Sequence, residues 1–158
     1  MRIGLLSDSH GELEPLQRAL QELGEVNLLL HAGDLYTDAL WLGKQTEIEV
    51  LGVTGNCDVW STGPRDRIIE IEGRKLWLVH GHRLGIKHGY DEMIAAARNR
   101  GVDLVVFGHT HHPIVFECDD IVFINPGSVT DGRGCERSYG LVEIGGDGIS
   151  ANTFPLVD

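Results

Sequence analysis

The sequence predicts an α/β fold in which two β-sheets pack face to face and helices cover their outer sides. The first third of the 158 residues alternates short apolar strands with amphipathic helices, whereas the remainder consists mainly of short strands separated by turn residues. Such alternation favours parallel strands joined by right-handed crossovers. Too few helices remain to cover one wide sheet, so two packed sheets account best for the pattern.

The first third is predicted to run strand, helix, strand, helix, strand. Its strands are expected at Arg2–Leu6, Asn27–His31 and Glu47–Val53. Leucines recur at three- and four-residue spacing between positions 13 and 23, which is the apolar stripe of an amphipathic helix. Pro15 is tolerated in the first turn of this helix, and Gly24 is its expected stop. A short second helix is expected over Thr37–Leu42.

The second part is predicted to be dominated by antiparallel pairs. Arg67–Ile71 and Lys75–Val79 flank a turn at Glu72-Gly73-Arg74 and are expected to form a hairpin. A further amphipathic helix should begin near Tyr90 and end near Gly101. Short strands are then expected at Leu104–Phe107, Ile114–Glu117, Ile121–Asn125, Ser138–Ile144 and Ile149–Phe154.

Charge and composition exclude several classes of function. Lys and Arg number 13 against 24 Asp and Glu, for a net charge of −11. A long nucleic acid or an anionic membrane is therefore not an expected partner, because both require a basic surface. No apolar run approaches the ~20 residues of a membrane helix. Residues 1–158 are expected to form a single domain.

The compartment is predicted from the cysteines and the first residues. Cys57, Cys118 and Cys135 are odd in number and form no C-x-x-C pair, which argues against a disulfide framework or a thiolate zinc site. Met1 leads directly into the first strand, so no signal peptide is expected. A reducing, cytoplasmic location follows as the prediction.

Five predicted strands each end in a polar group that contains Asp, Asn or His. In chain order these groups are Ser7-Asp8-Ser9-His10-Gly11, His31-Ala32-Gly33-Asp34, Thr54-Gly55-Asn56-Cys57-Asp58, His80-Gly81-His82 and Gly108-His109-Thr110-His111-His112. Functional sites in α/β sheets form outside the carboxyl ends of strands. Carboxylate, amide oxygen and imidazole suit first-row divalent ions, so the pattern indicates a metal site.

This ordered set resembles the calcineurin-like metallophosphoesterases, most closely the small single-domain phosphodiesterases of bacteria and archaea. The resemblance spans nearly the whole chain and includes Asn125-Pro126-Gly127-Ser128. It implies a four-layer αββα fold of two sheets between helices. It also implies that Asp8, His10 and His111 bind one metal ion, that Asn56, His80 and His109 bind a second, and that Asp34 bridges both.

A binuclear site of this kind implies hydrolysis of a phosphoester. Two divalent ions ~3.5–4 Å apart polarise the phosphoryl group and hold a bridging hydroxide that attacks phosphorus in line with the leaving oxygen. Manganese is the expected activator, with iron, nickel or zinc as alternatives, since an imidazole-rich site does not select among them by affinity alone. The expected substrate is a small phosphoester. The oligomeric state stays open, and a homo-oligomer is one alternative.

One position departs from many members of the family. Many relatives carry histidine after the Asn ligand, where this chain has Cys57. A thiol of pKa ~8.5 is a poorer proton donor than histidine and carries no positive charge at pH 7. We therefore expect slow hydrolysis of esters with poor leaving groups and faster hydrolysis of diesters with acidic leaving groups. His82 or a metal-bound water could assist the leaving group instead.

Residues around these motifs have simpler interpretations. Asn125 is expected to support the site and could orient a histidine ligand, and Asp58 is expected to hydrogen-bond a ligand histidine rather than cap a loop. His31 reads as a buried, hydrogen-bonded histidine. Arg133 and Arg137 lie in a glycine-rich loop and read as solvated charges, although an arginine there could meet a substrate phosphate.

Two alternatives to the phosphodiesterase fit parts of the pattern. The first is a non-catalytic scaffold or binding module of the same fold, as in the retromer subunit that resembles this family but has lost ligands; here all seven positions are filled. The second is a metal-dependent hydrolase of another bond, such as a metallo-β-lactamase. That group carries H-x-H-x-D-H early in the chain, whereas here the early pair is Asp-x-His and the His-x-His is late.

Overall fold

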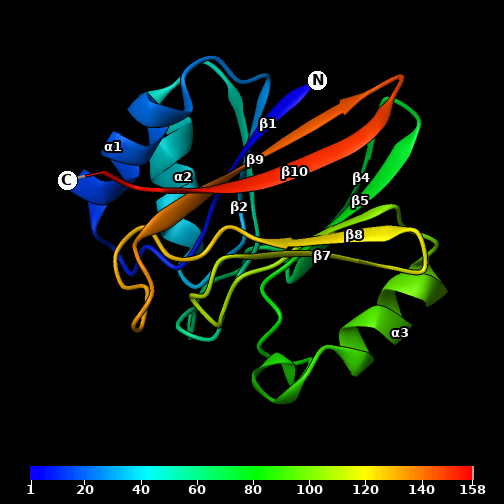
Figure 1. Ribbon diagram of the computed structural model, residues 1–158. Helices are drawn as coiled ribbons and strands as arrows, with labels where there is room; N and C mark the ends of the chain where they lie inside the picture. Colours follow the sequence, from blue (N-terminus) through cyan, green and yellow to red (C-terminus); the bar gives the residue numbers. More distant parts are fainter. Residues whose placement is uncertain (158) are drawn as a thin grey trace.

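The computed structural model describes residues 1–157, which form two five-stranded sheets and three α-helices (Figure 1). The first sheet has the order β10-β9-β1-β2-β3. Its strands are β1 (Arg2–Leu6), β2 (Leu28–His31), β3 (Glu49–Gly52), β9 (Ser138–Gly145) and β10 (Gly148–Pro155). Strands β1, β2 and β3 run parallel, as the alternating first third predicts, and β9 and β10 add antiparallel strands on the other side of β1.

The second sheet has the order β4-β5-β6-β8-β7. Its strands are β4 (Asp66–Ile71), β5 (Arg74–Val79), β6 (Leu104–Val106), β7 (Ile114–Cys118) and β8 (Ile121–Asn125). The predicted hairpin is confirmed as the antiparallel pair β4–β5. Its two turn residues, Glu72 and Gly73, have φ of 52° and 75°, which is the left-handed backbone that suits a two-residue hairpin turn.

Three hydrophobic clusters define four layers. Ile3, Leu30 and Leu78 belong to the cluster between the two sheets. The second cluster lies where α1 (Leu13–Leu23) and α2 (Tyr36–Gln45) cover the first sheet, and it includes Leu16. The third lies under α3 (Asp91–Arg100) on the second sheet and includes Trp77. Figure 1 shows α1 and α2 on one outer side and α3 on the other, so the predicted two-sheet fold flanked by helices is confirmed.

The structure differs from the expected elements in a few places. The second helix is longer than Thr37–Leu42 because it includes Tyr36 at its start and continues to Gln45. Leu13 is 40 % exposed, so only part of the leucine stripe of α1 is core. A short 3₁₀ helix at Ile86–His88, which periodicity cannot reveal in three residues, precedes α3. Of the helices in residues 1–157, none combines the length and apolar character that a membrane crossing requires.

Candidate metal centre

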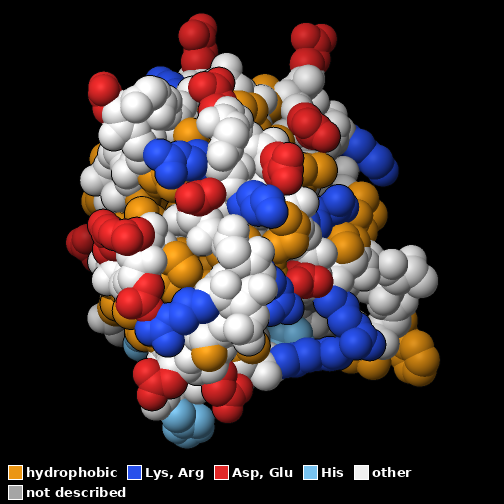
Figure 2. All heavy atoms as spheres, turned by 90° about the vertical axis from the view of Figure 1, so that its right-hand side faces the viewer, with side chains coloured by type: hydrophobic (Ala, Val, Ile, Leu, Met, Phe, Trp, Pro, Cys, Tyr) orange, Lys and Arg blue, Asp and Glu red, His pale blue; other side chains and the backbone are white. Residues whose placement is uncertain are grey.

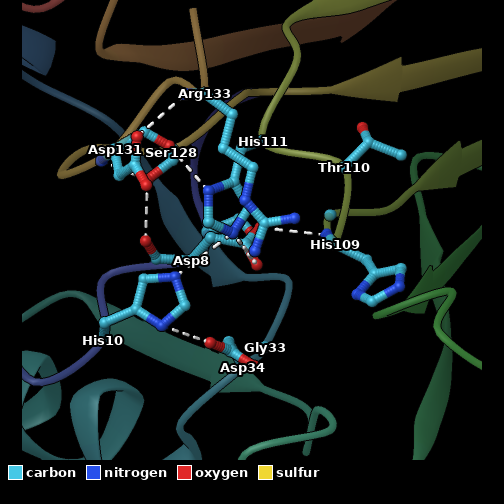
Figure 3. A network of polar contacts seen from close by, with 12 residues as sticks. Asp8, His10, Gly33, Asp34, His109, Thr110, His111, Ser128, Asp131 and Arg133 are labelled. Atoms are coloured by element: carbon cyan, nitrogen blue, oxygen red, sulfur yellow. Dashed lines mark hydrogen bonds and ion pairs between the residues drawn. The ribbon is translucent and has the colours of Figure 1, made fainter. Parts of the chain in front are cut away.

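The polar strand ends meet at the carboxyl edge of the parallel strands. β1 leads into Asp8 and His10, and β2 leads into Asp34. The segments after β3, β5 and β6 supply the remaining predicted ligands, Asn56, His80, His109 and His111. Figure 3 shows His10 directed toward Asp34, while His109 points to the opposite side of Asp8. All seven predicted ligand residues are therefore brought into one network, which consists of two groups of side chains with Asp34 between them.

The first side of the network consists of Asp8, His10 and His111. Nε2 of His111 lies 3.3 Å from Asp8 Oδ1 and 3.2 Å from His10 Nε2. His111 Nδ1 lies 2.6 Å from the carbonyl oxygen of Asp131. Because a carbonyl oxygen only accepts, Nδ1 donates the proton there, and in the neutral ring Nε2 presents a lone pair to Asp8 and His10. Three groups with available lone pairs thus converge on one point.

The second side consists of Asn56, His80 and His109. Asn56 Oδ1 lies 3.0 Å from His80 Nε2 and 3.2 Å from His109 Nδ1. His80 Nδ1 donates to the carbonyl oxygen of Ala32 at 2.8 Å, so in the neutral ring Nε2 carries a lone pair. That lone pair faces the amide oxygen of Asn56, which is also an acceptor. Two ligand atoms bound at ~2.1 Å to one ion, at right angles, would lie ~3.0 Å apart, which matches these separations.

Asp34 lies between the two sides. Its Oδ2 is 2.5 Å from His10 Nδ1, and its Oδ1 is 3.8 Å from His80 Nε2. Asp34 Oδ2 and Asp8 Oδ1 are buried, and each lies against an imidazole nitrogen of another predicted ligand without forming a well-aligned hydrogen bond. A buried carboxylate oxygen without such a bond is costly unless a cation compensates it. The donor set and these two oxygens therefore fit divalent metal ions at this site.

The other oxygen of Asp8 is anchored by the protein. Ser7 Oγ donates to Asp8 Oδ2 at 2.6 Å, and the backbone N–H of His109 donates to the same oxygen at 3.0 Å. Ser128 and Thr130 hydroxyls donate to the backbone carbonyl of Asp8 at 2.8 and 3.0 Å. Asp8 is thus held in place through one oxygen and its backbone, while the second oxygen faces the site.

The backbone is strained at the ligand residues. Five of the seven have positive φ: Asp8 (53°), His10 (50°), Asp34 (88°), His109 (70°) and His111 (66°). Only nine non-glycine residues in the described chain have positive φ. This backbone conformation costs of order 1 kcal/mol or more for a residue with a side chain, and such strain gathers at functional sites.

Of two residues predicted to support the site, Asn125 does so and Asp58 does not act as predicted. Asn125 Nδ2 donates to the carbonyl oxygen of Gly108 at 2.9 Å and to Thr110 Oγ1 at 3.0 Å, so it holds the loop that carries His109 rather than an imidazole ring. The prediction that Asp58 binds a ligand histidine is wrong. Its carboxylate accepts from the backbone N–H groups of Tyr36 and Gly55 at 2.8–3.0 Å, which caps two loops.

The motifs do not reveal a buried hydrogen-bond network in which Ser9, His31 and Asp38 take part. Ser9 Oγ donates to Asp38 Oδ2 at 2.5 Å and lies 2.9 Å from His31 Nε2. The backbone N–H of Gly11 also donates to Asp38 Oδ2, at 2.9 Å. His31 is buried and hydrogen-bonded, as its sequence context predicts, and burial lowers its pKa. Asp38 gives no signal in the sequence, because only the packing of α2 brings it to the loop after β1.

Charge and burial shift the pKa values of the site in different directions. Burial by itself raises the pKa of Asp8. The contacts of its carboxylate with His111 and His80 lower the pKa by more than burial raises it, so the net shift is downward. Burial lowers the pKa of His111, but the Asp8 carboxylate outweighs this, and the net shift is upward. Burial and the neighbouring His80 lower the pKa of His109 to about 4. Neutral His109 is the form that can bind a metal ion.

Cys57 and His82 lie at the edge of the network. A hydrogen bond to Asp34, together with burial, raises the pKa of the Cys57 thiol to about 11, so the thiol stays neutral at physiological pH. The His82 ring centroid lies 5.2 Å from that of His80 and 6.1 Å from that of His109. Its Nδ1 is buried without a hydrogen-bond partner, and burial lowers its pKa.

The comparison with known families agrees with this geometry. A model of the calcineurin-like phosphoesterase superfamily domain matches residues 1–147. The chain belongs to the calcineurin-like phosphoesterase superfamily. The predicted class, a metal-dependent phosphoesterase, is confirmed at this level, as is the predicted resemblance to the small phosphodiesterases of this superfamily.

Individual relatives cover nearly the whole chain. A probable metallophosphoesterase of Methanothermobacter thermautotrophicus is 32% identical over 156 residues, covering 96% of this chain and 90% of the relative. Phosphodiesterase YfcE of Escherichia coli is 28% identical over 169 residues, with 90% and 88% covered. The crystal structure of a predicted phosphoesterase from Streptococcus pneumoniae superposes with a TM-score of 0.82 at 28% identity, covering 98% of this chain and 88% of that one. The fold of this chain is thus shared with that phosphoesterase over nearly the whole chain.

Proposed function

We propose that this member of the calcineurin-like phosphoesterase superfamily is a binuclear metal-dependent phosphodiesterase that hydrolyses small phosphoesters by in-line attack of water at phosphorus. The observation that supports this most directly is the position of Asp34. One of its oxygens, the buried Oδ2, lies against His10 Nδ1, and the other lies toward His80 Nε2. A carboxylate in this position suits a ligand shared by two ions. Two such ions, with manganese the expected metal, would supply Lewis acidity to the phosphoryl group and activate the attacking water.

The protein's own residues would hold the ions and orient the ester. Asp8, His10 and His111 would hold one ion, Asn56, His80 and His109 the other, and Asp34 both. In the reaction one P–O bond forms to the water oxygen, the P–O bond to the leaving group breaks, and the leaving oxygen takes up a proton. Asn56 lies at the rim of this arrangement and is exposed enough to meet a phosphate oxygen as well as an ion.

His82 is proposed to contact the substrate rather than an ion. It carries a buried ring nitrogen without a protein partner, close to His80 and His109. Its lowered pKa keeps the ring neutral at pH 7, so it can donate one hydrogen bond and accept another. A phosphate oxygen or the leaving oxygen would be its partner.

The cytoplasmic location and the extent of the domain over residues 1–158 stay predictions.

The test combines metal analysis with a substrate panel. The protein, reconstituted with manganese, is expected to bind about two ions and to hydrolyse bis(p-nitrophenyl) phosphate. Asp34→Asn should lower kcat/KM ~100-fold or more and reduce the bound metal, because the shared carboxylate is lost. Asp147→Asn, which makes the same charge change in the exposed turn between β9 and β10, is the matched control and should retain both properties.

Two results would contradict the proposal. Full activity and metal content in Asp34→Asn would show that this carboxylate is not a shared ligand. Absence of metal-stimulated hydrolysis across phosphomonoesters, linear diesters and cyclic nucleotides would favour the alternative of a non-catalytic scaffold or binding module with the same fold.

A further inference from the structure

A pocket of about 390 Å³ opens beside the metal centre and is unusually basic for this acidic chain. It shares His80 and His82 with the centre and extends from there between the loop after β3 and the loop after β5. Arg65, Arg83 and Arg100 line it, in a protein of net charge −11. Figure 2 shows Lys and Arg side chains gathered low on one face beside a hollow in which a histidine is visible.

The three arginines are not equivalent. Arg100 stacks over the Trp77 ring, with its guanidinium carbon 4.1 Å from the ring centroid, and lies 3.9 Å from the carboxylate of Asp66. Trp77 Nε1 donates to that carboxylate at 2.8 Å. Arg100 is therefore held against Trp77 and paired loosely with Asp66. Arg65 and Arg83 are exposed, and among the described residues neither forms an ion pair with an acidic side chain.

The acidic groups of the pocket are already occupied. Asp66 is engaged by Trp77 and Arg100. Asp58 accepts three hydrogen bonds from the backbone N–H groups of Tyr36 and Gly55. Among the described residues, the guanidinium groups of Arg65 and Arg83 thus remain without an acidic partner in a pocket that borders His80 and His82. Guanidinium forks match phosphate oxygens in charge and geometry.

We propose that this pocket binds one arm of the diester, and that the preferred substrates are small phosphodiesters whose arm carries a second phosphate, held by Arg65 and Arg83. This inference rests on the proposed function of the same site. It adds a substrate class: the ions take the scissile diester phosphate, and the arginines take a terminal phosphate of the same molecule. The size of the pocket is at the lower end of the range for small-molecule sites, which suits a nucleotide-sized arm rather than a polymer.

The test compares two matched substrates. The first is a thymidine dinucleotide with one diester linkage and no terminal phosphate; the second is the same dinucleotide with one added terminal phosphate, at either end. The manganese-loaded enzyme should hydrolyse the phosphorylated form with a kcat/KM roughly 10-fold higher, since charge-assisted hydrogen bonds from exposed arginines are partly screened. In the double variant Arg65→Gln/Arg83→Gln this ratio should fall toward 1.

A charge-matched control separates the pocket from general electrostatics. Arg2→Gln/Lys44→Gln removes two exposed positive charges at the start of β1 and the end of α2, away from the carboxyl edge of the sheet. This control should keep the 10-fold ratio. Calorimetry gives a second readout: thymidine 3′,5′-bisphosphate should bind the manganese-loaded protein more tightly than thymidine 5′-phosphate, and the double arginine variant should lose the difference.

The outcomes distinguish failure of this inference from failure of the proposed phosphodiesterase function. Equal hydrolysis of the two dinucleotides, or the same preference in the double arginine variant as in the native protein, would overturn the pocket assignment while leaving the phosphodiesterase intact. If neither dinucleotide nor bis(p-nitrophenyl) phosphate is hydrolysed, the proposed function fails. The calorimetric comparison then still decides whether the arginines bind a second phosphate.

Discussion

Asp8 shows at the scale of one residue how the chain prepares a site for a cation. Ser7 and the backbone of His109 hold one carboxylate oxygen, so the other is left buried and faces the His111 imidazole. The backbone of Asp8 also has a φ of 53°, which is unfavourable for a residue with a side chain. Both are explained if folding positions this oxygen for a metal ion.

The residue scale also yields a prediction at Cys57. Its thiol is hydrogen-bonded to Asp34 and has a pKa raised to about 11, so at pH 7 it carries no charge and donates a proton poorly. Replacing it by histidine should supply a group that titrates near neutral pH. We expect Cys57→His to raise kcat/KM for p-nitrophenyl phosphate about 10-fold or more, measured with the manganese-loaded protein.

Cys135→His is the control for this substitution, because Cys135 is also exposed but lies in the glycine-rich loop near Arg133. It should leave the rate unchanged. A lower phosphomonoesterase activity in Cys57→His would contradict the explanation given for the thiol.

At the scale of elements, the site is made by the segments that leave the strands. β1 and β2 are fixed by register, with Leu6 opposite His31, so their ends lie side by side. The next residues must turn within a small space. A Cβ atom on Gly55 would lie only 2.4 Å from the Cα of Asp34, and one on Gly108 would lie 2.1 Å from Ser7 Oγ. These glycines therefore permit the strand ends to approach one another closely.

This close approach predicts the effect of Gly55→Ala. The added methyl group meets backbone atoms of Asp34, which cannot rotate away, so either the loop or Asp34 must shift. We expect a loss of about 1–3 kcal/mol in the free energy of unfolding and weaker manganese binding, measured by thermal unfolding with and without the metal. Gly145→Ala is the matched control, because nothing lies within 4 Å of a Cβ atom there. Equal stability and equal metal affinity in the two variants would be inconsistent with this account.

At the scale of the whole molecule, two sheets packed through three hydrophobic clusters place the candidate site at one edge. Predicted ligands from both sheets meet there: Asp8 and Asp34 follow strands of the first sheet, and His80 and His109 follow strands of the second. Binding of an ion at this junction therefore joins the two sheets and should stabilise the folded state as a whole.

Metal removal tests this coupling. At a free manganese concentration of ~100 times Kd, one site adds about 2.7 kcal/mol of stability. In a chain of this size that corresponds to a Tm roughly 5–10 °C higher than in the protein treated with excess chelator. Asp34→Asn should lose most of this difference. An unchanged Tm after chelation of the manganese-loaded protein would show that the ions do not bind at the junction of the sheets.

Much of the fold follows from local patterns. The alternation of strands and helices in the first third predicts three parallel strands, and β1, β2 and β3 confirm them. The turn at Glu72-Gly73 predicts the β4–β5 hairpin. Element ends are less well predicted, as α2 shows, because tertiary packing rather than propensity decides where a helix stops. The three-residue 3₁₀ helix before α3 is too short to leave a periodic signal.

The sequence by itself determined the composition of the site, because the ligand types follow strand ends in an order that is highly specific. Only the tertiary structure decided how neighbouring residues are used. Asp58 caps loops rather than binding a ligand histidine, Asn125 supports the site by holding a loop, and Asp38, which gives no signal in the sequence, supports Ser9. The tertiary structure alone also placed Arg65 and Arg83 in one pocket with His82. The physical reason is that strand and helix signals depend on near neighbours in the chain, whereas a hydrogen-bond network or a charged pocket depends on groups that only folding brings together.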